Sequence, residues 1–242
     1  MTDQPRPEQN SLLGALEGAE RARIFADLEL VPLGLGQVLC EANEPFTHAY
    51  FPAAGIVSIL YVMENEASAE IAVVGKEGMV GVALFMGGDS TLSRAIVQNA
   101  GHAYRLDAQQ LKAEFNRAAA FQMLLLRFVN SLITQMVQTA ACNRHHTVDQ
   151  QLCRWLLLSL DRLPRNQLHM TRELIGNMLG IAGQAVDAAA AVLGRAGLIT
   201  FDGGNISVLN RPGIEELSCE CYGVVKRETD RLMHRAALKA AF

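Results

Sequence analysis

The sequence predicts an α+β protein with an N-terminal β-rich domain, a long central helix and a C-terminal domain of short helices and a hairpin. Three observations support this fold class. Short β-prone runs separated by glycines fill residues 33–106, a heptad pattern follows over 111–136, and a helix–glycine–helix–hairpin pattern occupies 171–209. With 50% hydrophobic and 19% charged residues, a chain of 242 residues can bury a sizeable core.

Charge is unevenly distributed along the chain. Residues 1–142 carry 9 Lys/Arg and 15 Asp/Glu, a net charge of −6, whereas residues 143–242 carry 12 and 10, a net charge of +2. We therefore expect a phosphate-facing surface in the second half, although its basic excess is small. An odd number of cysteines, five, suits a reducing compartment, so we expect a cytoplasmic protein.

The most apolar stretch is FQMLLLRFVNSLITQMV. Arg127 and Asn130 interrupt it, and it is shorter than the roughly 20 apolar residues of a bilayer span. We therefore expect a soluble protein with no membrane partner.

The first domain is predicted to span residues 11–106, after a disordered tail over residues 1–10. A helix is expected from Ser11 to about Leu30, with Asn10 or Ser11 as its N-cap. Beyond it, no helical pattern of 10–15 residues interrupts the β-prone runs. This favours an antiparallel, jelly-roll-like β-roll (a double-stranded β-helix) over a parallel α/β sheet.

Residues 107–142 are predicted to form one long helix, capped by Asp107. Its apolar residues recur at intervals of four and three, as in a coiled coil, which favours a dimerisation helix. The alternative is an amphipathic helix packed on its own domain. The residues expected in the dimer interface are Phe115, Gln122, Leu125, Val129, Leu132 and Met136.

A short polar segment, residues 143–147, is expected to be a hinge before a second domain over residues 148–212. The first helix of that domain ends before Pro164, since proline cannot continue a helix. The remaining residues, 213–242, are expected to form a C-terminal helix.

The segment after Pro164 predicts a winged helix-turn-helix. Thr171 is the expected N-cap of a helix that ends at Gly180, where a left-handed conformation costs glycine little. A second helix is expected from about Gly183 to Arg195, followed by a hairpin around Asp202–Asn205. In such a motif the second helix enters the major groove of DNA. The alternative is an ordinary helical hairpin beside a β-hairpin.

In this order of elements, the sequence resembles the Crp/Fnr family of bacterial transcription regulators over residues 12–235. The resemblance implies a β-roll sensor, a dimerisation helix and a DNA-reading domain. It further implies a homodimer that binds a palindromic operator in double-stranded DNA, with RNA polymerase and a small-molecule effector as further candidate partners. The segments that carry the resemblance are KEGMVGVALFMGG, CNRHHTVDQQLCRWLL, MTRELIGNMLG and AGLITFDGGNISVLNRPGIEELSCECY.

The DNA contacts of the family match only in part. The Thr-Arg start of the first helix is present, and the resemblance implies a phosphate contact there. In the second helix, Gly183 and Ala188 stand where the family has arginine, and Gln184 stands where glutamate is common. We therefore expect unusual, weak or lost sequence specificity. The expected DNA-binding positions are Thr171, Arg172, Gly183, Gln184, Asp187 and Ala188.

Two of these side chains have alternative roles. Gln184 is able to hydrogen-bond an adenine edge, and Asp187 is able to accept from a cytosine amino group. For Asp187, an interaction with the positive end of the helix dipole is the simpler interpretation.

The candidate effector pocket is Gly81, Val82, Ser90, Thr91 and Arg94. A cyclic nucleotide needs backbone N–H groups and a guanidinium for its phosphate, and a carboxylate for its ribose. Val82 stands where the carboxylate is expected, and no arginine directly precedes the hydroxyl pair. The sequence therefore predicts an effector other than cyclic AMP, or none.

No catalytic residue, cofactor or metal ion is predicted, and we expect the protein not to be an enzyme. His145 and His146 adjoin Cys142 at the hinge, where metal binding competes with simple hinge polarity. Cys219 and Cys221, two residues apart in an expected helix, are predicted to face different directions. The alternative function is a dimeric sensor or partner-binding protein of the same fold with impaired specific DNA binding.

Overall fold

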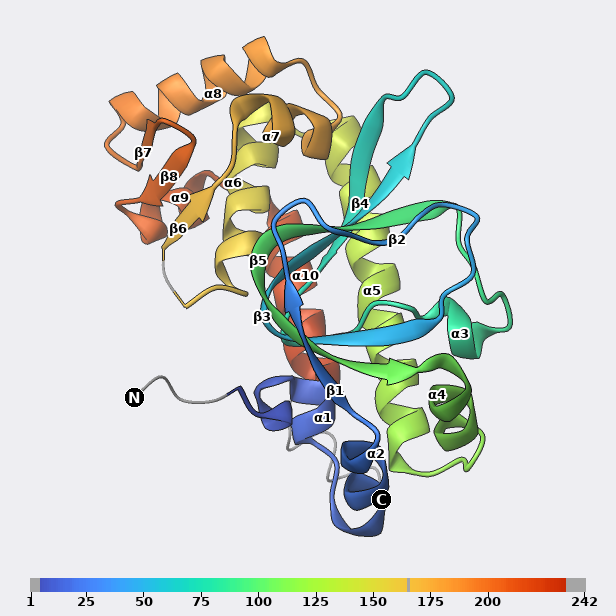
Figure 1. Cartoon of the computed structure of the whole chain (residues 1–242). Helices are drawn as coiled ribbons and strands as arrows, with labels where there is room; N and C mark the ends of the chain where they lie inside the picture. Colours follow the sequence, from blue (N-terminus) through green and yellow to red (C-terminus); the bar gives the residue numbers. More distant parts are fainter. Residues whose placement is uncertain (1–4, 165, 234–242) are drawn as a thin grey trace.

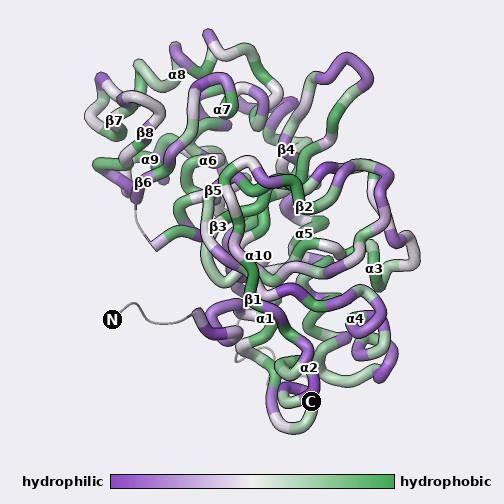
Figure 2. The backbone as a smooth tube through the Cα atoms, viewed as in Figure 1, coloured by the Kyte–Doolittle hydropathy of each residue, from purple (hydrophilic) through white to green (hydrophobic). Residues whose placement is uncertain are grey.

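The computed structural model describes residues 5–164 and 166–233. A β-roll lies against the long helix α5 (Ala120–His145), and the helices and small sheet of the C-terminal domain lie at one end of that helix (Figure 1). Residues 1–4 of the expected tail and 234–242 of the expected C-terminal helix lie outside the described residues. Hydrophobic segments gather where the strands face α5, and hydrophilic segments follow the outlying loops (Figure 2).

The N-terminal segment is more structured than predicted. Residues 7–9 form a 3₁₀ helix, and Asn10 is fully buried. The Asn10 side-chain carbonyl accepts from the N–H groups of Leu12 and Leu13, which makes it the N-cap of α1. Its amide donates to the carbonyls of Pro52 and Gly78, at 2.9 and 2.8 Å. Because both ends of its side chain are satisfied inside the core, Asn10 ties the segment to the β-roll, and the disordered tail cannot extend to residue 10.

The single helix expected over 11–30 is two short helices followed by a strand. They are α1 (Ser11–Gly14), α2 (Gly18–Ala26) and β1 (Glu29–Leu33). Gly18 has a positive φ of 57°, which lets the chain turn between the two helices.

The β-roll is antiparallel, which confirms the predicted fold class. Its strand order is β1-β5-β3-β4, with β2 also paired to β5. At Gly101, a Cβ would lie 2.2 Å from the carbonyl oxygen of Ala54, so the long pair β3–β5 needs a glycine where it bends. The other elements of this domain are β2 (Val38–Cys40), β3 (His48–Val62), β4 (Ser68–Val74), α3 (Ala83–Met86), β5 (Ser93–Asp107) and α4 (Ala108–Phe115).

The predicted long helix is broken. Asp107 caps α4 as expected, but this helix ends at Phe115, the chain turns through Ala118, whose φ is 54°, and α5 begins at Ala120. Leu125 and Leu132 belong to the core of the β-roll of their own chain.

The face predicted for the dimer interface is therefore wrong. Phe115 and Met136 pack against the same core, Val129 is buried and Gln122 is half-buried. A helix that covers the sheet of its own chain has the same apolar spacing as a helix of a coiled coil. For this face, the alternative of an amphipathic helix packed on its own domain is the correct one.

A second apolar stripe runs along the outer face of α5. Met123, Leu126, Ile133 and Val137 are all exposed large hydrophobic residues, and together with Asn130 between them they are spaced 3, 4, 3 and 4 residues apart. By length and composition alone α5 is apolar enough to span a membrane, with 44% of its most apolar window buried. Core helices of soluble proteins pass the same test, and α5 covers a β-roll.

The C-terminal domain carries a three-stranded sheet with the order β6-β8-β7. Thr147 caps the first helix through the N–H of Gln150, and that helix ends before Pro164 as predicted. The expected helix from residue 213 is instead a short helix and a longer one, separated at Ser218–Cys219. The elements are α6 (Val148–Leu160), β6 (Gln167–His169), α7 (Arg172–Leu179), α8 (Gly183–Arg195), β7 (Ile199–Asp202), β8 (Asn205–Val208), α9 (Arg211–Leu217) and α10 (Glu220–Met233).

A buried polar chain links the β-roll to α6. Ser58 lies 2.5 Å from a carboxylate oxygen of Glu70 and 3.1 Å from the side-chain carbonyl of Gln98, whose amide donates to Ser159 of α6. A hydroxyl has one hydrogen, so Ser58 is unable to donate to both acceptors. Protonated Glu70 would donate to Ser58 and leave Ser58 free to donate to Gln98.

Burial raises the pKa of Glu70 from 4.5 to about 7, against the opposing effects of the Ser58 hydrogen bond and the positive charges of Arg154 and Arg162. The carboxyl is therefore uncharged in the folded protein over a pH range in which it is charged in the unfolded chain. Its folded pKa is raised, so its proton stabilises the fold below about pH 4.5, and this stabilisation is lost as the pH rises toward 7.

We predict that Glu70→Gln removes one component of the pH dependence of stability. Between pH 4.5 and 8 the wild type should lose up to about 3 kcal/mol of unfolding free energy relative to the variant. Denaturant unfolding of both proteins across this range measures the difference, and histidine titration cancels because it is common to both. Parallel stability profiles for the two proteins would contradict the prediction.

Candidate nucleic-acid interface and ligand cavity

The two helices α7 and α8 meet as in a helix-turn-helix. The chain bends by 107° between them, within the range of about 90–120° for this motif. Thr171 caps α7 by accepting from the N–H of Leu174 at 3.3 Å, and Gly180 ends it with a φ of 67°, both as predicted. At Gly176 a Cβ would lie 2.8 Å from the carbonyl oxygen of Ile181, so the close approach of the turn needs this glycine.

The second helix of the motif divides into two faces. Val186, Ala190 and Leu193 are buried on the inner face, as predicted. The outer face carries four of the sequence-predicted DNA-binding positions: Gln184, Asp187 and Ala188 are exposed, and Gly183 is partly exposed with open space where a side chain would begin. The hairpin of β7 and β8 follows the helix, as expected for a wing.

Arg172 contacts this outer face through an ion pair with Asp187. Its Nε lies 2.8 Å from a carboxylate oxygen of Asp187, and its guanidinium carbon lies 4.7 Å from the centre of the Phe201 ring on the wing. Thr171, Arg172 and Phe201 line an open hollow together with the wing residues Gly203 and Gly204. The structure thus joins the start of α7, the first turns of α8 and the wing around one guanidinium.

Neither interpretation of Asp187 made from sequence included the contact that the structure shows, an ion pair of its carboxylate with Arg172 of the other helix. Arg211 is also held within the protein, in ion pairs with Asp161 and Glu215. Arg195, at the end of α8, is exposed. Two of these three arginines, Arg172 and Arg211, are therefore partly neutralised. The contact of Arg172 with Phe201 was not foreseen, since only the fold brings them together.

A cavity of about 80 Å³ lies between the β-roll and α5. This volume is smaller than that of most small-ligand sites. It is lined mainly by apolar side chains, and two of them, Leu132 and Met136, come from α5. A ligand in the cavity would therefore touch the helix that leads to the C-terminal domain.

The cavity contains three of the five predicted effector residues, Gly81, Val82 and Thr91. Ser90 and Arg94 are not among its lining residues. Arg94 is instead paired with Glu41 at 2.7 Å. Among the lining residues of the described chain there is no Lys or Arg, so a phosphate in this cavity would find no cationic partner.

A β-roll joined by a long helix to a winged helix-turn-helix is the architecture of a class of transcription regulators, which are not enzymes. Residues 30–118 match the family model described as "Cyclic nucleotide-binding domain", and residues 150–217 match "Crp-like helix-turn-helix domain". The chain belongs to the Crp/Fnr family of transcription regulators, as its sequence predicted. No curated protein sequence matches it.

Solved structures share the fold at low sequence identity. FixK2 from Bradyrhizobium japonicum has a TM-score of 0.69 at 17% identity, covering 79% of this chain and 98% of that one. A putative Crp/Fnr regulator from Eubacterium rectale has a TM-score of 0.68 at 15% identity, covering 85% and 96%. The c-di-GMP-responsive regulator CLP from Xanthomonas campestris has a TM-score of 0.64 at 16% identity, covering 79% and 99%.

We predict that Asp187→Asn strengthens DNA binding. The substitution frees Arg172 for a phosphate and removes a repelling charge, so affinity for random duplex at low salt should rise roughly threefold to tenfold. The plot of log affinity against log salt should steepen by about one unit per protomer. Fluorescence anisotropy titrations at several salt concentrations measure both effects.

Two controls make this prediction specific. Glu173→Gln removes one exposed charge beside Arg172 without touching the ion pair, and it should have a smaller effect. In an Arg172→Ala background, Asp187→Asn should raise DNA affinity much less than it does in the wild type. An equal gain with and without Arg172 would mean that the ion pair does not restrain binding.

Proposed function

We propose that this protein is a cytoplasmic homodimer that binds a palindromic DNA operator and whose N-terminal domain responds to an effector other than cyclic AMP. The observation that carries the proposal is the outer face of α8, which is free of the protein's own packing and is flanked by Thr171, Arg172 and the wing. Such a face is where a helix-turn-helix contacts base edges. The predicted DNA-binding residues Gly183, Gln184, Asp187 and Ala188 all lie on it.

The exposed stripe of α5 supports the dimer. Met123, Leu126, Ile133 and Val137 follow the 3.5-residue spacing with which a second helix packs in a coiled coil. Asn130, in the middle of the stripe, is the type of residue that fixes register and strand number. A second copy of this chain, bound about a two-fold axis along α5, would cover the stripe of each protomer with the same stripe of the other.

The apolar lining of the cavity supports an uncharged or weakly polar effector. A cyclic nucleotide carries a phosphate, and burying an unpaired anion costs several kcal/mol or more. Thr91 and Ser93 supply the hydroxyl groups of the lining, enough to orient a small molecule that carries one or two polar groups.

A second candidate function is a dimeric sensor or partner-binding protein that has lost specific DNA binding. The ion pair between Arg172 and Asp187 favours it, because a paired guanidinium attracts phosphate less. The sequence of α8 also favours it, since Arg195 at its very end is the sole Lys or Arg between Gly183 and Arg195.

We predict that selection from a pool of random duplexes, using the full-length protein at low salt, enriches a palindrome. Its half-sites should lie one helical turn apart, about 34–36 Å between centres. Gln184→Ala should relax the preference at one position of each half-site, whereas Arg172→Ala should weaken binding to all sequences alike. Salt-dependent binding without any enrichment would reject the proposal and favour the second candidate.

We predict that Ile133→Asp turns the dimer into a monomer, because a carboxylate would be buried without a partner at the centre of the interface. Sedimentation velocity at micromolar concentration gives the assembly state, and circular dichroism checks the fold. Leu35→Asp is the matched control: it places the same charge at an apolar residue of similar exposure, 58% against 50%, away from α5. A wild-type monomer, or a dimeric Ile133→Asp variant, would contradict the proposed interface.

A further inference from the structure

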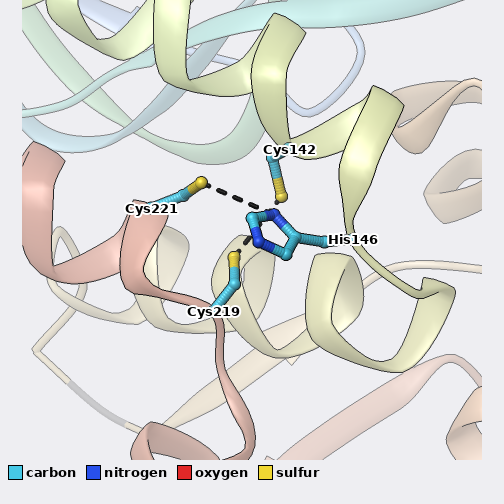
Figure 3. A group of neighbouring side chains, drawn as sticks. All are labelled: Cys142, His146, Cys219 and Cys221. Carbon is cyan, nitrogen blue, oxygen red and sulfur yellow. Dashed lines mark hydrogen bonds between the residues drawn. The ribbon is translucent and has the colours of Figure 1, made fainter.

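Four side chains that bind soft metal ions meet beside the hinge between the two domains. Cys142 and His146 lie at the end of α5, and Cys219 and Cys221 lie at the start of α10 (Figure 3). One ligand atom from each of the four falls within 4.8 Å of all the others. The three cysteines are buried and form a cluster of their own, and the histidine side chain is 16% exposed.

Local structure explains how two short sequence patterns converge on one point. Cys142 lies in the last turn of α5, and His146 is the C-cap residue, whose N–H donates to the carbonyl of Cys142 at 3.0 Å, so the two residues stay close together at the helix end. Cys219 precedes α10 and is not helical, whereas Cys221 lies in the first turn of that helix. The two sulfurs therefore face the same point, and the prediction that they face different directions is wrong because it assumed one continuous helix.

The distances fit one tetrahedral ion. Zinc binds cysteine sulfur at about 2.3 Å and histidine nitrogen at about 2.0 Å, so the edges of its tetrahedron are about 3.8 Å between sulfurs and about 3.5 Å between sulfur and nitrogen. The Sγ atoms of Cys142 and Cys219 are 3.5 Å apart, and the Sγ of Cys221 is 3.6 Å from Nδ1 of His146. These two separations lie within about 0.3 Å of the tetrahedral edges, and the other pairs of ligand atoms lie within 4.8 Å.

The surroundings also suit a metal site. Nε2 of His146 lies 3.2 Å from a carboxylate oxygen of Glu220, the type of partner that orients a ligating histidine and leaves the other nitrogen for the metal. Three thiolates around a dipositive ion leave one negative charge. The buried guanidinium of Arg154, whose positive charge acts on Cys142, is of the opposite sign.

A disulfide accounts for less of this arrangement. It would join Cys142 and Cys219 by drawing their sulfurs from 3.5 Å to about 2.05 Å, and it would leave the third thiol and the imidazole without a role. An iron–sulfur cluster needs its cysteine sulfurs spread around several iron atoms, more widely than this group allows. One ion uses all four side chains at their present separations.

We propose that Cys142, His146, Cys219 and Cys221 bind one structural Zn²⁺ ion that fastens the start of α10 to the end of α5. Four protein ligands close the coordination shell, which marks a structural rather than a catalytic site. Because His146 ends the helix that leaves the β-roll and Thr147 starts α6, the ion would hold the junction of the two domains in one geometry. This site does not depend on the proposed operator or effector.

The test is metal analysis of the full-length protein purified under reducing conditions. We expect about one zinc per chain by mass spectrometry of the metal content. Exchange with Co²⁺ alone should give thiolate-to-cobalt charge-transfer bands and intense tetrahedral d–d bands. Cys219→Ser, Cys221→Ser and His146→Gln should each lower metal affinity by at least about tenfold. Cys153→Ser and His145→Gln are the matched controls and should leave it unchanged, because these residues lie outside the group.

If the ligand variants fail to fold, two measurements on the wild-type protein alone still test the proposal. X-ray absorption at the zinc edge should show three sulfur neighbours and one nitrogen neighbour, and removing the ion with a chelator should lower the unfolding temperature. Three results would overturn the proposal: reduced protein that binds neither Zn²⁺ nor Co²⁺, metal content equal in control and ligand variants, or a first shell without sulfur.

Discussion

Helix α5 has apolar residues on two faces. The β-roll packs on one of them, and the other stays exposed in a single chain. Leu125 and Leu132 complete the core of the β-roll on one face. Burying such side chains stabilises by about 1.5–3 kcal/mol each, so the face turned inward is fixed by the fold of one chain. What remains outward is a separate stripe that a single chain leaves exposed, and the end of the same helix carries Cys142 and His146.

The same helix connects the cavity of the β-roll to the C-terminal domain. Leu132 and Met136 line the cavity, and Gln135 between them exchanges hydrogen bonds with both backbone groups of Val73, at 2.9 and 3.1 Å. Val73 lies on β4, and the same strand carries Glu70. From Glu70 a chain of hydrogen bonds through Ser58 and Gln98 reaches α6. The last bond of this chain, from Gln98 to Ser159, is made only while the domains touch. A ligand that displaced α5 would therefore disturb the contact with the DNA-reading domain without reaching it.

Signals carried by one or two neighbouring residues were readable from sequence: Asn10, Asp107 and Thr171 as caps, and Gly180 as a helix end. Features that depend on how distant segments pack together could not be predicted from sequence. The heptad pattern does not say whether a sheet of the same chain or another helix covers it, and the break at Ala118 has no glycine or proline to mark it. The four metal-binding side chains come from two short sequence patterns, which begin 77 residues apart at Cys142 and Cys219. Each pattern alone is too weak to predict a site before the helices are packed.

Because α8 carries few basic residues, the proposed DNA binding depends strongly on the proposed dimer. Of the groups on its outer face, Gln184 is suited to hydrogen-bonding a base edge and Ala188 to an apolar contact with a thymine methyl, while Asp187 repels phosphate. One such domain would gain little from counterion release, so under the proposed function a single half-site would be bound weakly. Two domains joined rigidly bind their half-sites as a single event, and the linkage multiplies affinity without any new contact. The fewer basic groups the reading helix carries, the more the proposed function depends on the stripe of α5 and on a fixed junction at His146.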